Sequence, residues 1–185
     1  MISGGSVHVS VTSSLGDAEA ASFLKFAYSA CRIDGNALGW LPKLAYDQRH
    51  QEGRIHAVYN NADLVGFCLW YNEGSELRIY QTWVRPDARQ ILHGRALLEA
   101  VESEGRSRDA SRITLWCATD LAANVFWRAL QFERGSWRFS KGRSSRRHWF
   151  WSKKIATIGQ SLGQSCYTQA VSIEPPIVPA SPLVA

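Results

Sequence analysis

The chain has 185 residues, of which 45% are hydrophobic and 20% charged, and its formal net charge is +5 at pH 7. This length and balance suit one globular domain with a substantial core and argue against a disordered or fibrous protein. No apolar run approaches the roughly 20 residues that span a bilayer, and the N-terminal segment lacks the basic and apolar regions of a signal peptide. We therefore expect a soluble, cytoplasmic protein that has no membrane partner.

The first half of the chain alternates between strand-like and helix-like patterns. A helical apolar stripe follows Asp17, which is a good N-cap residue, and a shorter helix has Pro42 near its start and Gly53 as its stop. Two β-rich runs joined by a short polar turn predict a hairpin. In chain order, the predicted elements are a strand at 7–13, helices at 14–32 and 41–53, and strands at 54–60, 63–72 and 76–84.

The second half predicts further helices and strands and then a tail. Its elements are a helix at 91–106, a strand at 112–118, a helix at 121–132 after the capping residue Asp120, and two strands around a basic turn within 135–154. After these, Ser, Gln, Pro and Ala dominate and charge nearly disappears. We expect an α/β (α+β) domain over residues 1–155, a mixed sheet with helices on both faces, and a flexible or loosely docked tail over 156–185.

The four cysteines are widely spaced and form no CxxC pair; they are Cys31, Cys68, Cys117 and Cys166. Three of them lie inside apolar segments, as reduced thiols that pack in a core do. This spacing indicates neither a disulfide framework nor a metal site.

The segment 89–98, with the sequence RQILHGRALL, joins a predicted strand to a predicted helix. Free backbone N–H groups and the helix dipole at such a junction form a site for a phosphate. Gly94 would let a ligand approach the backbone, and Arg89 and Arg95 add positive charge. Taken alone, these ten residues favour a simpler interpretation, in which Gly94 is only a small residue packed against the sheet.

Two motifs change the balance between these interpretations. In the first, Val84 and Pro86 match V-x-P, and Arg89 and Gly94 match the ends of R/Q-x-x-G-x-G/A, with Leu92 in place of the first glycine. The second motif is N-x-x-A-x-x-F-Y-x-x-x-G-F. Ala123, Phe126 and Phe132 match it, whereas Asp120, Trp127 and Gln131 stand where the motif has Asn, Tyr and Gly. Residues 7–153, with these motifs on the expected elements, resemble the GNAT superfamily of N-acetyltransferases.

The resemblance implies a mainly antiparallel sheet in which the strands at 76–84 and 112–118 splay into a V-shaped cleft. It also implies an enzyme that uses acetyl-CoA (coenzyme A) to acylate a small-molecule or macromolecular amine by direct attack in a ternary complex, as a monomer or homodimer. The pyrophosphate would rest on backbone N–H groups at 92–96. The implied cofactor-binding residues are Trp83, Val84, Arg89, Gln90, Leu92, His93, Gly94, Arg95, Ala96, Asn124 and Trp127.

The motifs do not assign the catalytic groups, because Trp127 replaces the tyrosine that is the family's usual acid. Tyr80 on the cofactor-side strand is the nearest substitute, and Cys117 or water are the alternatives. Glu76 at the start of the same strand is a candidate base, and Asp120 is a candidate for orienting the amine. Each of the three side chains also has an ordinary structural interpretation. Tyr80 would be an aromatic residue of a strand, Glu76 a solvated charge at a strand end, and Asp120 a helix cap. His50, His56 and His148 show no triad pattern.

Residues 134–154 combine basic and aromatic side chains without any acidic residue. Such a segment is typical of single-stranded nucleic-acid binding, although a terminal hairpin with inward rings and outward charges has the same composition. It motivates two alternatives to an ordinary acetyltransferase. One is a DNA-base modification enzyme similar to the Mom type, and the other is a non-catalytic module that binds CoA or nucleic acid.

Overall fold

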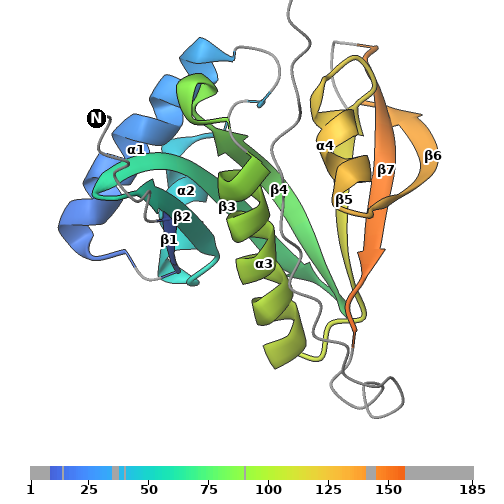
Figure 1. Cartoon of the computed structure of the whole chain (residues 1–185), viewed down its shortest axis with the longest axis horizontal. Helices are drawn as coiled ribbons and strands as arrows, with labels where there is room; N and C mark the ends of the chain where they lie inside the picture. Colours follow the sequence, from blue (N-terminus) through green and yellow to red (C-terminus); the bar gives the residue numbers. More distant parts are fainter. Residues whose placement is uncertain are drawn as a thin grey trace, which may run out of the picture.

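The computed structural model describes residues 9–13, 15–34, 38–39, 41–89, 91–140 and 145–156. The predicted strands and helices in this part of the chain are present, with ends that differ by a few residues (Figure 1). In chain order they are β1 (Val9–Thr12), α1 (Asp17–Ile33), α2 (Lys43–Gln51), β2 (Ile55–Asn60), β3 (Asp63–Glu73), β4 (Glu76–Val84), a 3-10 turn (Pro86–Ala88), α3 (Ile91–Ser107), β5 (Arg112–Ala118), α4 (Ala123–Ala129), β6 (Glu133–Phe139) and β7 (Arg147–Lys154).

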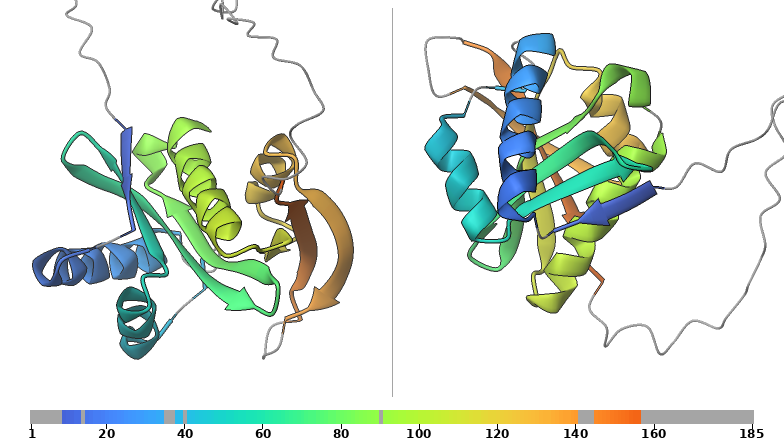
Figure 2. Two further views of the ribbon diagram at one scale, coloured as in Figure 1. Left: turned by 90° about the horizontal axis from the view of Figure 1, so that it is seen from below. Right: turned by 90° about the vertical axis from the view of Figure 1, so that its left-hand side faces the viewer.

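The strands form one sheet in the order β1-β2-β3-β4-β5-β7-β6. Every neighbouring pair is antiparallel except β4 and β5, which are parallel. Figure 2 shows α1 and α2 on one face of the sheet and α3 on the other. The prediction of a mixed, mainly antiparallel sheet with helices on both faces is therefore confirmed.

Two apolar clusters lie on the two faces of the sheet. One packs Leu97 and Val101 of α3 against strand residues such as Trp70, and the other packs Phe23 of α1 against residues such as Phe67. Because both faces of β3 are covered, its residues from Val65 to Trp70 are all buried instead of alternating between buried and exposed.

The parallel pair β4–β5 is short, and this opens the sheet. Only four residue pairs join the two strands, from Glu76↔Arg112 to Ile79↔Leu115, and beyond them the strands diverge (Figure 1). A bulge in β4 contributes, because Ile79 and Gln81 pair with neighbouring residues of β3 and leave Tyr80 unpaired. The V-shaped splay expected from the family resemblance is present.

Several local expectations need correction or fall outside the described residues. Gly16, and not Asp17, occupies the N-cap position of α1, and its N–H donates to the Glu19 carboxylate over 2.9 Å. Gly53 follows the end of α2 with a φ of +64°, a left-handed conformation that glycine adopts without strain, as expected of a helix stop. Nearly all of the predicted tail lies outside the described residues. Within the described residues, no helix has the length and apolar character needed to cross a membrane.

Candidate functional site in the cleft between β4 and β5

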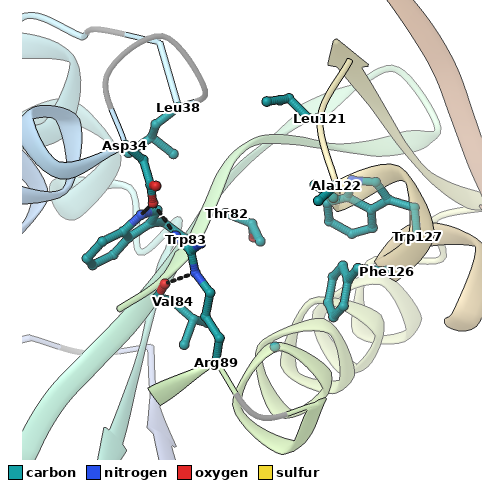
Figure 3. Close-up of a pocket in the computed structure, with 12 residues that line it drawn as sticks. Asp34, Leu38, Thr82, Trp83, Val84, Arg89, Leu121, Ala122, Phe126 and Trp127 are labelled. Carbon is teal, nitrogen blue, oxygen red and sulfur yellow. Dashed lines mark hydrogen bonds and ion pairs between the residues drawn. The ribbon is translucent and has the colours of Figure 1, made fainter. Parts of the chain in front are cut away.

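Two cavities lie where β4 and β5 diverge. The first, here called the α3 cavity, has a volume of about 460 Å³ and lies between β4, the start of α3 and α4 (Figure 3). The second, here called the β7 cavity, has a volume of about 350 Å³ and is lined partly by β6 and β7. Both cavities are lined by Leu38, Thr82, Leu121, Ala123 and Trp127. They therefore lie next to each other in the opening between the two halves of the sheet, which is here called the cleft.

The α3 cavity is bounded by backbone groups that can bind a ligand. Within the described residues, the edge of β4 that faces β5 has no strand partner beyond Ile79, so the backbone groups of alternate residues between Tyr80 and Val84 border the cleft instead of joining a ladder. The first turn of α3 lies beside the same cavity at Gly94, and the N–H groups of a first turn have no partner within their helix. Together with the helix dipole, this arrangement favours an anion.

Arg89 lines the α3 cavity as the motif predicts, but its charge already has a partner. Its guanidinium forms an ion pair with Asp34, in the segment after α1, and its Nε donates to the Val84 carbonyl over 3.0 Å. Trp83 Nε1 donates to the same carboxylate (Figure 3). Sequence reasoning missed Asp34, which lies 55 positions from Arg89 and gives no local signal.

Gly94 is required by close packing against α4. A Cβ at this position would lie 2.8 Å from both Cε2 and Cζ of Phe126, whose ring also lines the α3 cavity. The simpler interpretation of Gly94 as a packing residue is therefore right in kind, but its neighbour is α4 and not the sheet. The same contact brings the helix start to the cavity wall, so the two interpretations are compatible.

The other predicted cofactor-binding side chains around the start of α3 do not line the cavity. His93 is buried, and its Nδ1 lies 2.8 Å from the Ala88 carbonyl oxygen. Arg95 Nε donates to Glu99 one turn along the helix over 2.8 Å. Leu92 is exposed and Ala96 half-buried, and neither lines either cavity. Gln90 lies outside the described residues. Among the described residues of this turn, Gly94 is the one that lines the α3 cavity, so the turn meets the cavity through its backbone.

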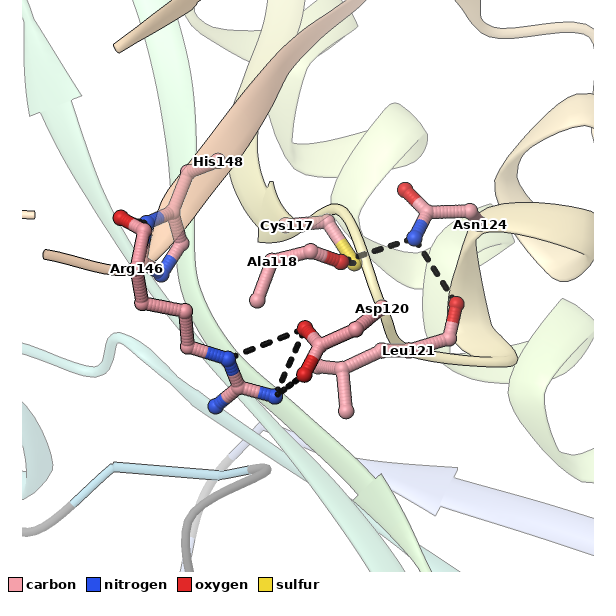
Figure 4. Close-up of polar contacts among 7 residues, drawn as sticks. All are labelled: Cys117, Ala118, Asp120, Leu121, Asn124, Arg146 and His148. Carbon is pink, nitrogen blue, oxygen red and sulfur yellow. Dashed lines mark hydrogen bonds and ion pairs between the residues drawn. The ribbon is translucent and has the colours of Figure 1, made fainter. Parts of the chain in front are cut away.

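Asn124 also acts within the protein and not toward the cavities. Its Nδ2 donates to the carbonyls of Ala118 and Leu121 over 2.8 and 2.7 Å (Figure 4), and its Oδ1 accepts from Trp151 Nε1 over 3.0 Å. These bonds tie the end of β5 and the start of α4 to β7. Asn124 therefore fixes the wall of the cleft and has no free polar group in it.

Trp127 is buried in the wall that the two cavities share. Burial raises the pKa of the neighbouring Cys117 thiol to about 11, and a hydrogen bond with Trp127 opposes this shift. The thiol is therefore protonated at neutral pH, and Cys117 is not an activated nucleophile.

The β7 cavity is rich in guanidinium groups. Three guanidinium groups line it, together with aromatic side chains, and none of its lining residues is Asp or Glu. The three are Arg78, Arg138 and Arg146.

Asp120 is fixed by one of these arginines. Arg146 Nε and Nη2 donate to its two carboxylate oxygens over 2.9 and 3.0 Å (Figure 4). This hydrogen bonding lowers the pKa of Asp120, so the carboxylate stays ionised. The N-cap position of α4 belongs to Ala122, so the prediction that Asp120 caps this helix is wrong. Asp120 instead positions a guanidinium at the β7 cavity.

The remaining catalytic candidates are separated by the fold. Tyr80, the bulge residue, is 57% exposed and lines the β7 cavity beside Tyr71. Glu76 lies at the closed end of the V, where it forms an ion pair with Arg112, and it lines neither cavity. The structure thus brings Tyr80 to the cleft and leaves Glu76 outside it.

His148 is a residue of the cleft that sequence reasoning missed. It lines the β7 cavity, is half-buried, and its Nδ1 lies 3.2 Å from the Arg146 carbonyl oxygen (Figure 4). Its Cα pairs with Ala118, the last residue of β5. Only the pairing of β7 with β5 reveals this position, because no sequence motif surrounds His148.

The basic aromatic segment divides between core and surface. Trp151 is buried, whereas Trp137 and Phe139 of the edge strand β6 are 47% and 54% exposed. Arg147 lies over the ring of Trp137 at 5.5 Å. Two cations of the segment have acidic partners from outside it, because Arg146 pairs with Asp120 and Lys153 with Glu102. Nucleic-acid binding by the segment stays a prediction.

Comparisons with known proteins agree with this geometry. Residues 21–132 match the model of the Acetyltransferase (GNAT) family. No curated protein sequence gives a significant match.

Solved structures share the fold at low sequence identity. A ribosomal-protein alanine N-acetyltransferase from Escherichia coli is 19% identical with a TM-score of 0.64, and the alignment covers 84% of this chain and 99% of that one. Ard1 from Thermoplasma volcanium is 16% identical with a TM-score of 0.68, over 80% and 98% of the chains. N-acetylglutamate synthase from Neisseria gonorrhoeae, solved with coenzyme A and N-acetyl-glutamate, is 12% identical with a TM-score of 0.64, over 82% and 36% of the chains. Because the family model matches more than half of the sequence and the fold has the family's open cleft, this chain belongs to the acetyltransferase (GNAT) family.

Proposed function

We propose that the protein is an N-acetyltransferase that binds acetyl-CoA in the α3 cavity and an amine acceptor in the β7 cavity. The observation that carries this proposal is that the two cavities adjoin each other, with five shared lining residues, where β4 and β5 diverge. A donor and an acceptor that enter from opposite ends would meet near Thr82, Leu121 and Trp127, which line both cavities. This arrangement suits direct transfer in a ternary complex.

The residues of the α3 cavity fit the parts of acetyl-CoA. The free edge of β4 offers backbone groups that match the amides of a pantetheine arm. The first turn of α3, held against α4 by the close contact of Gly94 with Phe126, offers N–H groups to a pyrophosphate. Arg89 would bind phosphate in competition with Asp34. When bound, acetyl-CoA supplies a thioester carbonyl that an amine can attack.

The described lining of the cleft offers groups for moving protons but no activated protein nucleophile. His148 would accept a proton from the amine, because an Nδ1–H bonded to the Arg146 carbonyl leaves Nε2 as an acceptor. Tyr80 would donate a proton to the leaving sulfur. Cys117 remains protonated, which argues against a covalent acyl-enzyme. The cytoplasmic location and the monomeric or homodimeric state stay predictions.

The proposal is tested first by titration calorimetry with CoA and then by thiol release from acetyl-CoA with a panel of amines. His148→Gln should lower kcat by roughly 10²–10⁴-fold and leave the Kd for CoA unchanged. Glu76→Gln is the control, because Glu76 lies on the same sheet but outside the cleft, and its kcat should stay near that of the wild type. Failure to bind CoA at millimolar concentration would overturn the proposed function, and a wild-type kcat in His148→Gln would overturn the role of His148.

A further inference from the structure

We propose that the β7 cavity recognises an oxyanion on the acceptor, and that Arg138 is the residue that binds it. The acceptor would then be an amine that also carries a carboxylate or a phosphate group. This inference rests on the proposed function for the location of the acceptor, and it adds the chemical class of that acceptor.

The charge of the cavity lining supports an anionic occupant. Three guanidinium groups face a space of about 350 Å³ that no Asp or Glu lines. Two of them form ion pairs with carboxylates that do not line the cavity: Arg78 pairs with Glu73, and Arg146 pairs with Asp120. The charge left for a ligand to neutralise is therefore that of Arg138, and it favours a carboxylate or phosphate over a purely cationic acceptor.

Arg138 differs from the other two arginines in having no acidic partner. Within the described part of the chain, no carboxylate lies within ion-pair distance of its guanidinium. The guanidinium carbon instead lies 3.8 Å from the ring centroid of Trp116, whose own ring packs against Phe150. A guanidinium stacked on a ring keeps its in-plane N–H donors free for bidentate binding of an oxyanion. The stack also restrains the side chain before the ligand arrives, which lowers the entropy lost on binding.

The register of the sheet places Arg138 beside His148. Arg138 pairs with His148 across β6 and β7, and His148 pairs with Ala118 at the end of β5. Directly paired residues have Cβ atoms roughly 5 Å apart on the same face of a sheet. An amine beside His148 and an oxyanion on Arg138 therefore fit one compact molecule, such as an amino carboxylate or an amino phosphate.

The test measures binding of two simple probes to the full chain, with and without saturating CoA. Trifluoroacetate, followed by fluorine NMR, represents a carboxylate, and methylphosphonate, followed by phosphorus NMR, represents a phosphate. For the wild type we expect the signal of at least one probe to broaden. The apparent affinity for that probe should fall at least tenfold in Arg138→Gln. Arg138→Lys should have an intermediate affinity, because a lysine keeps the charge but lacks the planar guanidinium. Arg134→Gln is the matched control, since Arg134 lies on the same strand over Trp149 at 4.5 Å and lines neither cavity.

Each outcome decides the inference. If the signal of just one probe broadens, that probe identifies whether the oxyanion is a carboxylate or a phosphate. No broadening by either probe in the wild type, or equal broadening in Arg138→Gln, would overturn the inference. The calorimetric titration with CoA separates this failure from that of the proposed function, because CoA binding at the α3 cavity does not require Arg138.

Discussion

Replacing Gly94 by alanine tests whether the contact between α3 and α4 shapes the cavity for CoA. The added Cβ would lie 2.8 Å from two ring carbons of Phe126, roughly 0.7 Å inside the ~3.5 Å separation at which carbon atoms normally touch. Phe126 lines the α3 cavity, so its ring relieves the overlap by turning into that cavity or by pushing α4 away.

Two opposing effects set the change in stability. Alanine is about 1 kcal/mol better than glycine in a helix, whereas overpacking costs about 1–3 kcal/mol. We therefore expect the free energy of unfolding to fall by only ~0–2 kcal/mol. CoA affinity should fall more clearly, at least about tenfold or 1.4 kcal/mol, because the displaced ring occupies space that the ligand needs.

Urea denaturation measures the first quantity and titration calorimetry with CoA measures the second. Gly105→Ala is the matched control, because its Cβ would also be crowded, 2.3 Å from Ile155 Cδ1, on the same helix but away from the cavities. It should lose stability and keep its CoA affinity. Adding Phe126→Ala to Gly94→Ala should restore CoA binding in part. If Gly94→Ala binds CoA as tightly as the wild type, the ring of Phe126 does not border the CoA site and our placement of the cofactor fails.

Two further predictions concern the half-buried Asn124 and the buried His56. Asn124→Ala removes three hydrogen bonds and leaves Trp151 Nε1 without its partner, so urea denaturation should show a loss of roughly 2–3 kcal/mol; a loss below about 0.5 kcal/mol, ordinary for a surface substitution, would contradict this role. His56 is buried, and burial lowers its pKa from 6.5 to about 4. Because the folded pKa lies below the unfolded one, stability is complete above about pH 6.5 and is lost as the pH falls toward 4, by at most about 3 kcal/mol. His56→Phe should flatten this slope between pH 7.5 and 4.5, and an unchanged slope would assign the acid sensitivity to other groups.

The sequence predicts those parts of the fold that depend on periodicity and backbone geometry. The helices and strands and the helix start after β4 follow from patterns that are local in the chain, whereas the splay of β4 and β5 is expected only from the family resemblance. Backbone N–H groups at a helix start do not depend on which side chain occupies position 92, so the substitution of Leu92 for glycine leaves the main feature of the motif intact.

The side-chain partners at the site depend on sheet order and could not be predicted in the same way. Asp34 reaches Arg89 across 55 positions, and Arg146 reaches Asp120 across 26. His148 enters the cleft only because β7 is inserted between β5 and β6. Polar residues such as Asp120 and Glu76 have the right chemistry for catalysis, and only their three-dimensional partners assign them to ion pairs.

The short seam between β4 and β5 has a mechanical consequence. The two halves of the sheet meet through the four residue pairs from Glu76↔Arg112 to Ile79↔Leu115, and one half carries the free edge of β4 while the other carries His148 and Arg138. From Ile79 to Val84 the free arm of β4 extends roughly 16 Å at about 3.3 Å per residue. A rotation of about 5° at the seam would therefore move the end of that arm by roughly 1.4 Å, a displacement large enough to change reaction rates about a hundredfold. The buried side chains at the pivot, Leu77 and Ile113, would thus set the distance between the proposed donor and acceptor sites although they line neither cavity.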